Sequence, residues 1–165
     1  MKVLLISDSH GNNALLRNII EKVKADFIIH CGDSCTDIKS LPKIDVIVKG
    51  NCDFYPFLDE KIIDIANFPF FITHGHLYNV KTSLLRLYKA SLKKKVKIIC
   101  FGHSHIPFLG KKNNMLFLNP GSITKPRKVT TPTYALLNLK YPFVSCDFFS
   151  VKQDPYPLKG DFSLE

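Results

Sequence analysis

Five separate apolar runs in this chain are each followed, within a few residues, by side chains that commonly bind metal ions. The runs are VLLIS, FIIHC, IDVIVKG, PFFIT and VKIICFG. The polar residues that follow them are Asp8 and His10, Asp33, Asn51, His74, and His103 and His105. Short apolar runs bounded by turn residues are typical of buried strands. The fold must therefore accommodate polar groups at the ends of five strands.

Taken singly, each of these residues has an ordinary structural explanation. Asp8 could cap a helix, Asp33 could form a turn beside Gly32, and a histidine could be a satisfied core or surface group. The joint pattern favours a binding site instead. In open α/β sheets the carboxyl ends of the strands lie along one edge, and ligands bind there. We therefore expect the side chains to converge in one crevice.

The candidate set combines carboxylate, amide and imidazole groups. Such mixed oxygen and nitrogen donors suit Mn²⁺, Fe²⁺, Zn²⁺ or Ni²⁺, whereas a structural zinc site is usually rich in sulfur. In Asp8-Ser9-His10 and His103-Ser104-His105, an extended backbone would direct the first and third side chains to the same side. Seven donors are too many for one cation. Two cations about 4 Å apart that share one carboxylate would account for all of them.

The remaining patterns indicate one mixed α/β domain over residues 1–165. A helix is expected over residues 13–24, capped by Asn12, with a helical turn at 37–41 and a second long helix at 81–95. EKIIDI reads as a strand, and two hairpins are expected from PFLG to MLFLN and from TYALLNL to FVSCDFFSV. The antiparallel strands would extend or face a parallel sheet. The residues from Gln153 onward show prolines and no period, so a terminal extension is expected there.

Composition narrows the class of protein. The chain has no apolar run long enough to cross a membrane, and VLLIS is too short for a signal peptide, so we expect a cytoplasmic protein without a membrane partner. Five cysteines without a CxxC pair indicate reduced, mostly buried thiols, with Cys52 as the exception. The net charge of +9 is compatible with a phosphate-bearing partner, but a lysine-rich surface also serves solubility.

The motifs DSHG, GDS, GNCD, THGH and GHSH occur in this order, and NPGSITKPR follows them. Over residues 1–127 this series resembles the calcineurin-like metallophosphoesterase superfamily, most closely its small bacterial and archaeal phosphodiesterase branch. The resemblance implies a fold of two packed mixed β-sheets, a β-sandwich, flanked by α-helices. It also implies two divalent metal ions, with Mn²⁺ expected first and Ni²⁺, Zn²⁺ and Fe²⁺ as alternatives. One ion would be held by Asp8, His10 and His105, the other by Asn51, His74 and His103, with Asp33 between them.

The same resemblance yields three candidate catalytic residues. Asp53 and His76 match positions that orient ligands or contact the phosphate. Cys52 stands where the wider superfamily has a histidine that assists the leaving group. A thiol donates a proton to such a group less readily than an imidazolium, so good leaving groups should be favoured. His30 lies inside an expected strand and is interpreted as a core or supporting histidine.

The predicted function is a dinuclear metal-dependent phosphodiesterase that attacks a small phosphodiester with a hydroxide bridging the two metals. No serine lies in a GxSxG elbow, so a protein nucleophile is not expected. Three alternatives remain. They are a non-catalytic protein-binding scaffold of the same fold, like a retromer subunit, a nuclease, and a phosphomonoesterase. The chain lacks interleaved aromatic and basic residues of the RNA-binding type, which makes a nucleic acid the lesser expectation as partner.

Overall fold

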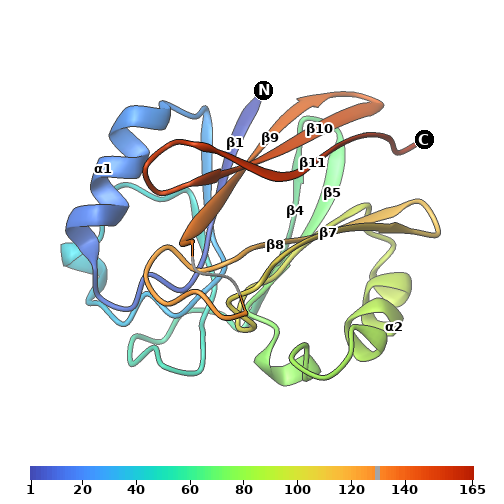
Figure 1. Cartoon of the computed structure of the whole chain (residues 1–165). Helices are drawn as coiled ribbons and strands as arrows, with labels where there is room; N and C mark the ends of the chain where they lie inside the picture. The colour runs from blue at the N-terminus through green and yellow to red at the C-terminus, as the bar shows by residue number, and fades with distance from the viewer. Residues whose placement is uncertain (129–130) are drawn as a thin grey trace.

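Two β-sheets packed against each other form the centre of the molecule, and one helix covers the outer face of each sheet (Figure 1). This computed structural model describes residues 1–128 and 131–165. The architecture is the α/β arrangement of two mixed sheets that the motifs imply. In the described residues no helix combines the length and the apolar character needed to cross a membrane.

The first sheet has six strands, and the half that ends at β3 is parallel. Strands β1, β2 and β3 are parallel, whereas β9, β10 and β11 continue the sheet in antiparallel pairs. The order is β11 (Pro155–Ser163), β10 (Phe143–Ser150), β9 (Thr133–Lys140), β1 (Lys2–Ile6), β2 (Phe27–His30) and β3 (Val46–Ile47). The predicted hairpin in this region is therefore formed by β9 and β10.

The second sheet has five strands with a parallel core and antiparallel edges. Its order is β4 (Glu60–Ile65), β5 (Phe68–Thr73), β6 (Ile98–Cys100), β8 (Met115–Pro120) and β7 (Pro107–Lys112). The edge pair β7 and β8 is the other predicted hairpin. Both sheets thus carry parallel strands whose carboxyl ends are free to deliver side chains to a site.

Strand β1 is buried on both faces, which explains its uninterrupted apolar sequence. Val3 and Leu5 belong to the core between the two sheets, while Leu4 and Ile6 pack on the other side with residues of helix α1 (Asn13–Val23). Successive side chains of a strand point to opposite faces, so a strand covered twice must be apolar throughout. This double burial fixes the position of the residues that follow β1.

The two helices begin and end at recognisable signals. The Asn12 side chain accepts a hydrogen bond from the Leu15 backbone N–H at 3.1 Å, and α1 ends at Lys24, which has a left-handed φ of 48°. Helix α2 (Leu85–Lys94) begins four residues later than the predicted range of 81–95. Residues 81–83 are exposed and form a turn instead, because no buried side chain stabilises a further helical turn there. The short helix η1 (Ile38–Ser40) confirms the predicted turn at 37–41.

The expected terminal extension is wrong, because this segment forms strand β11 at the edge of the first sheet. Tyr156, Leu158 and Phe162 pack against the central core, and Leu164 is fully buried. Prolines are tolerated in an edge strand, where a missing N–H removes no ladder hydrogen bond on the solvent side. Strand β3 is also shorter than predicted and covers only Val46–Ile47.

Candidate metal centre

The candidate ligands lie where the carboxyl ends of the two sheets meet. Asp8 follows β1 and Asp33 follows β2 in the first sheet, whereas His74 follows β5 and His103 follows β6 in the second. Backbone hydrogen bonds join these segments. Asp8 N–H donates to Gly32 O at 3.0 Å, and Gly102 N–H donates to His74 O at 3.0 Å. The crevice thus lies between two sheets rather than along the edge of one.

Four of the predicted ligands form a tight group. Donor atoms of Asp8, His10, Asp33 and His105 all lie within 4.8 Å of one another. Within this group, His105 Nε2 is 3.0 Å from Asp8 Oδ1 and 3.4 Å from His10 Nε2. The structure therefore brings together the set expected around the first cation, with the expected shared aspartate beside it.

His74, His76 and His103 form a second group, which Asp33 contacts through His74. His74 Nε2 lies 3.4 Å from Asp33 Oδ2 and 4.0 Å from Asp8 Oδ1. The ring of His103 is 5.0 Å from that of His74, centre to centre, and the ring of His76 is 5.4 Å from His74. Asp33 consequently faces both histidine groups, as a bridging ligand must.

Asn51 lies in the turn after Gly50, and it is the most exposed of the predicted ligands. Its side-chain amide donates to Cys52 Sγ at 3.3 Å. The turn is tied to the centre because the Cys52 N–H donates to Asp33 Oδ1 at 2.8 Å. The role of Asn51 as a ligand stays a prediction.

Backbone carbonyls orient two of the histidines. His74 Nδ1 donates to Cys31 O at 2.7 Å and His105 Nδ1 donates to Lys125 O at 2.6 Å. A carbonyl can only accept, so the proton of each neutral ring is on Nδ1 and the lone pair of Nε2 faces the crevice. Metal-binding histidines are usually held in this way by their second nitrogen.

Buried polar atoms at the centre are suited to binding a cation. Asp8 Oδ1 and His74 Nε2 are buried, and neither has a hydrogen-bond partner among the described residues. The contact of 3.0 Å between Asp8 Oδ1 and His105 Nε2 requires a proton or a cation between two acceptor atoms. The residues present thus fit a divalent cation bound by oxygen and nitrogen.

The pKa values of the two aspartates favour the charged forms. Burial raises the pKa of Asp8, but the close contact with His105 and the charge of His74 outweigh burial and lower it overall. The pKa of Asp33 is likewise raised by burial and lowered further by His74 and by the Cys52 N–H, so that it lies well below its usual range. Both carboxylates are therefore available to a cation at neutral pH.

The histidines divide into two kinds. Burial lowers the pKa of His10, and it lowers the pKa of His103 to about 4, so both imidazoles are neutral at pH 7. Burial also lowers the pKa of His74, but its contact with Asp33 raises the pKa above the usual value. A cation bound at His74 Nε2 would compete with a proton for that atom.

Five of the seven candidate ligands adopt a left-handed backbone conformation. These residues are Asp8 (φ 55°), His10 (φ 44°), Asp33 (φ 57°), His103 (φ 64°) and His105 (φ 58°). The expected extended backbone in Asp8-Ser9-His10 and His103-Ser104-His105 is therefore wrong. Such conformations cost free energy and cluster at functional sites, where surrounding contacts impose them.

Asp53 holds together the turns that carry two of the candidate ligands. Its carboxylate accepts hydrogen bonds from the backbone N–H groups of Asp33, Cys35 and Gly50 and from the Ser34 hydroxyl, at 2.7 to 2.9 Å. These four donors occupy both oxygens, and the residue is 7% exposed. Asp53 thus joins the Asp33 turn to the Asn51 turn.

Other polar residues, for which the sequence predicted no role in the site, also hold the crevice. The hydroxyls of Ser122 and Thr124 donate to Asp8 O at 2.8 and 3.0 Å, and Asn119 Nδ2 donates to Gly102 O at 2.8 Å. All three lie in or beside the NPGSITKPR segment, which was the available signal. His30 supports the site as predicted, since it is fully buried and its Nε2 lies 2.9 Å from Ser9 Oγ.

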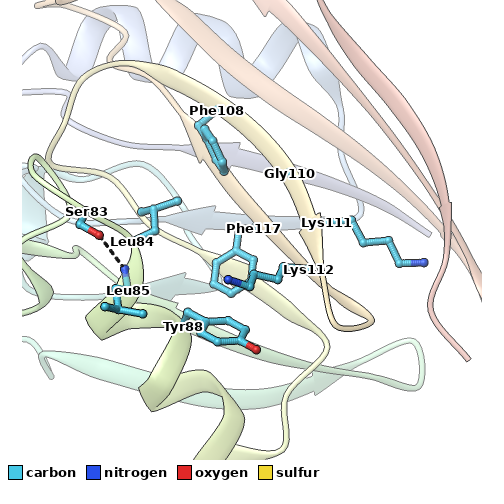
Figure 2. Close-up of a pocket in the computed structure, with 9 residues that line it drawn as sticks. All are labelled: Ser83, Leu84, Leu85, Tyr88, Phe108, Gly110, Lys111, Lys112 and Phe117. Carbon is cyan, nitrogen blue, oxygen red and sulfur yellow. Dashed lines mark hydrogen bonds between the residues drawn. The ribbon is translucent and has the colours of Figure 1, made fainter.

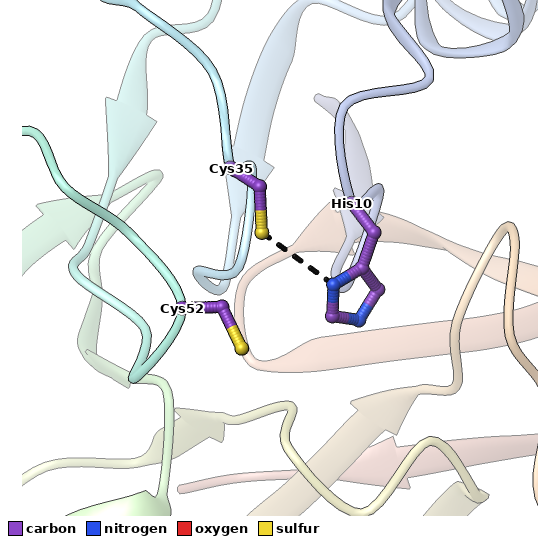
Figure 3. A group of neighbouring side chains, drawn as sticks. All are labelled: His10, Cys35 and Cys52. Carbon is purple, nitrogen blue, oxygen red and sulfur yellow. Dashed lines mark hydrogen bonds between the residues drawn. The ribbon is translucent and has the colours of Figure 1, made fainter.

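Two thiols stand beside the metal set. Cys35 Sγ lies 3.5 Å from His10 Nδ1, and Cys52 faces the same ring from the neighbouring loop (Figure 3). Burial raises the pKa of Cys35 to about 12, and burial together with Asp33 raises the pKa of Cys52. Both are therefore neutral thiols at pH 7. Cys35 followed no pattern visible in the sequence.

A separate pocket of about 560 Å³ lies between α2 and the β7–β8 hairpin. Tyr88, Phe108 and Phe117 face into it, and Lys112 lies over the Tyr88 ring (Figure 2). None of the predicted ligands lines this pocket. The candidate chemistry therefore lies in the crevice and not in this pocket.

Comparison with known proteins supports the interpretation of the crevice as a metal-binding site. The model of the calcineurin-like phosphoesterase superfamily domain matches residues 1–141. The chain belongs to the calcineurin-like phosphoesterase superfamily. This phosphoesterase is 40% identical over 154 residues to the probable metallophosphoesterase YsnB of Bacillus subtilis, with 90% of each chain covered. The family is one of hydrolases that use divalent metal ions, and the donor cluster described above is compatible with such ions.

Two further relatives extend the comparison. The phosphoesterase is 30% identical over 144 residues to the phosphodiesterase MJ0936 of Methanocaldococcus jannaschii. The alignment covers 73% of this chain and 83% of that protein. It superimposes with a TM-score of 0.90 on the crystal structure of a predicted phosphoesterase from Streptococcus pneumoniae, at 29% identity and with 98% and 97% of the two chains covered. The two-sheet fold is thus that of known metallophosphoesterases.

Proposed function

We propose that this phosphoesterase hydrolyses small phosphodiesters at a centre of two divalent cations, with Mn²⁺ as the first expectation and Ni²⁺, Zn²⁺ and Fe²⁺ as alternatives. The observation that supports this most directly is the position of Asp33, which faces both histidine groups. Asp8, His10 and His105 would hold one cation, and Asn51, His74 and His103 the other. Bound cations would supply charge neutralisation for the ester and activation of water.

The protein's own residues contribute orientation and proton control. The carbonyls of Cys31 and Lys125 fix His74 and His105 with Nε2 toward the crevice. Asp53 holds the two turns that carry Asp33 and Asn51 at a fixed separation. His76 stands beside His74 and His103, and its Nδ1 has no hydrogen-bond partner in the part of the chain that the structure describes, so we assign this ring the contact with the phosphate.

A diester is favoured as substrate by the name of the archaeal relative, a phosphodiesterase. A scaffold role is the second candidate, but a scaffold has no need for seven competent donors. A small ester rather than a nucleic acid is the proposed partner, since the crevice is formed by short turns. The five free cysteines are compatible with the reducing cytoplasm, where we place the protein.

The proposed function is tested by metal content and turnover together. After loading with Mn²⁺ and removal of excess metal, elemental analysis should find about two ions per chain. The loaded protein should hydrolyse bis-p-nitrophenyl phosphate, and chelation should abolish this activity. Comparison of Mn²⁺, Ni²⁺, Zn²⁺ and Fe²⁺ then ranks the metals. Binding of fewer than one ion per chain, or loaded protein without diester turnover, would support the scaffold.

Cys52 provides a test of leaving-group assistance. Its thiol is exposed on the Asn51 turn, and its raised pKa makes it a weak proton donor at neutral pH. Replacement by histidine should therefore raise kcat/KM for a diester with an alkyl leaving group by about a hundredfold, the lower end of the range of general acid catalysis. Turnover of bis-p-nitrophenyl phosphate, which needs little assistance, should stay nearly constant. Cys52→Ser is the matched control, and equal or lower activity of Cys52→His on the alkyl diester would contradict the idea.

A further inference from the structure

A loop of consecutive apolar residues stands exposed beside the metal centre. Phe54 is 97% exposed, Tyr55 is 36% exposed and Leu58 is 64% exposed, and Pro56 between them is exposed as well. Single exposed apolar side chains are common, but a run of them in one short loop is costly unless it serves binding. Folding leaves the Phe54 ring almost wholly exposed, so its position points to a ligand.

The loop forms one wall of a pocket of about 270 Å³. The opposite wall is the turn that follows Asp33, and the lining residues are Cys35, Thr36, Asp37, Phe54, Tyr55 and Pro56. Cys35 connects this pocket to the candidate centre, because its sulfur lies 3.5 Å from His10 Nδ1 (Figure 3). A group bound in the pocket would therefore lie next to the reacting phosphate.

The aromatic loop is held in place before any ligand arrives. Asp53, directly before Phe54, is fixed by its four hydrogen bonds, and Lys49 N–H donates to Leu58 O at 2.8 Å across the base of the loop. The rings of Tyr55 and Phe57 pack with their centres 4.7 Å apart. A preorganised aromatic surface loses little conformational entropy on binding.

The polar groups of the pocket are largely engaged already. The Thr36 hydroxyl donates to Ser34 O at 3.0 Å, and Asp37 Oδ1 accepts from the Lys39 N–H at 2.8 Å. These side-chain groups are therefore less available for hydrogen bonds to the polar edge of a bound ring. The pocket offers stacking and apolar contact, which accept any flat ring.

We propose that the 54–58 loop binds a planar aromatic ring carried by the ester, so that the preferred substrates are diesters of a nucleoside or of an aryl alcohol. This inference rests on the proposed function, because the ring must be joined to a phosphate in the adjacent crevice. It adds Phe54 as the residue that determines specificity. The ring would stack on Phe54, and the phosphate would remain at the metal centre.

Direct binding to the Mn²⁺-loaded protein tests the proposal without turnover. Calorimetry would compare methylphosphonate, phenylphosphonate and the non-hydrolysable phosphonate analogue of adenosine 5′-monophosphate. The wild-type protein should bind a ring-bearing phosphonate about tenfold more tightly than methylphosphonate. Phe54→Ala should remove this preference and leave methylphosphonate binding unchanged, whereas Phe54→Tyr should retain it. A preference confined to the adenosine compound would identify the nucleoside as the natural group.

The control is Phe143→Ala, which removes an aromatic ring that is 59% exposed on β10, in the sheet edge formed by β10 and β11. It should change none of the three affinities. The proposal is overturned if wild-type protein shows no preference for a ring, or if the preference survives in Phe54→Ala. Failure of all three phosphonates to bind would instead reject the metal centre and the proposed function. Because the side chain of Phe54 is exposed, its removal leaves the core intact.

Discussion

Asp33→Asn should lower the turnover of bis-p-nitrophenyl phosphate by about a thousandfold, which corresponds to roughly 4 kcal/mol of activation free energy. The reason is that Asp33 lies near both histidine groups and its carboxylate, 3.4 Å from His74 Nε2, is closer to that ring than the Asp8 carboxylate at 4.0 Å. An amide carries no negative charge and binds a divalent cation more weakly than a carboxylate does. The measurements are kcat/KM in metal-defined buffer and the number of Mn²⁺ ions retained per chain.

Asparagine is the suitable replacement because the backbone of Asp33 is left-handed, with φ 57°. Asparagine tolerates this conformation better than most residues, so the turn should keep its shape. Its side-chain oxygen can still accept from the Cys52 N–H, as Asp33 Oδ1 does at 2.8 Å. Asp64→Asn, on the exposed side of β4, is the matched control and should have wild-type activity. Wild-type turnover or two retained ions in Asp33→Asn would refute the assignment of a shared carboxylate.

The parallel strands could be predicted from the sequence because burial on both faces leaves a continuous apolar run. Leu4 and Leu5 illustrate this, since each packs against a different cluster. Strand β11 was missed because its prolines break the usual strand composition. Its signal was the alternation of Tyr156, Leu158 and Phe162, which a terminal position made easy to overlook. For a strand at a sheet edge, the alternation of apolar and polar residues is a better predictor than the strand propensity of the individual residues.

The donor set of the centre could be read from motifs, but its geometry could not. The motifs supplied the residue types after each strand, whereas the left-handed conformations of Asp8 and His105 depend on contacts with distant segments. Ser122, for example, binds the backbone of Asp8 across 114 positions of sequence. Local reasoning therefore predicted an extended backbone where tertiary contacts impose a turn. Cys35 was missed for a similar reason, since only the fold brings it to His10.

The buried contacts of Asp53 raise the question of whether it contacts the phosphate or positions the ligands. Its two oxygens accept four hydrogen bonds from the Asp33 and Gly50 turns. A phosphate in the crevice would therefore have to compete with these donors for any contact with Asp53. A residue in this arrangement acts through Asp33 and Asn51. It is then a positioning residue, and its removal should change metal affinity before it changes the recognition of the ester.

Asp53→Ala should therefore weaken Mn²⁺ binding by about a hundredfold and lower the free energy of unfolding by about 3 kcal/mol. The stability falls because three backbone N–H groups and one hydroxyl lose their acceptor inside the protein. Asp53→Asn should have a Mn²⁺ affinity and a free energy of unfolding between those of the wild-type protein and Asp53→Ala. Its single amide oxygen can accept only some of the four hydrogen bonds. Metal titration and urea unfolding measure the two effects. A direct contact with the phosphate would give the opposite pattern, with KM raised and Mn²⁺ affinity preserved, and that result would return Asp53 to the catalytic residues.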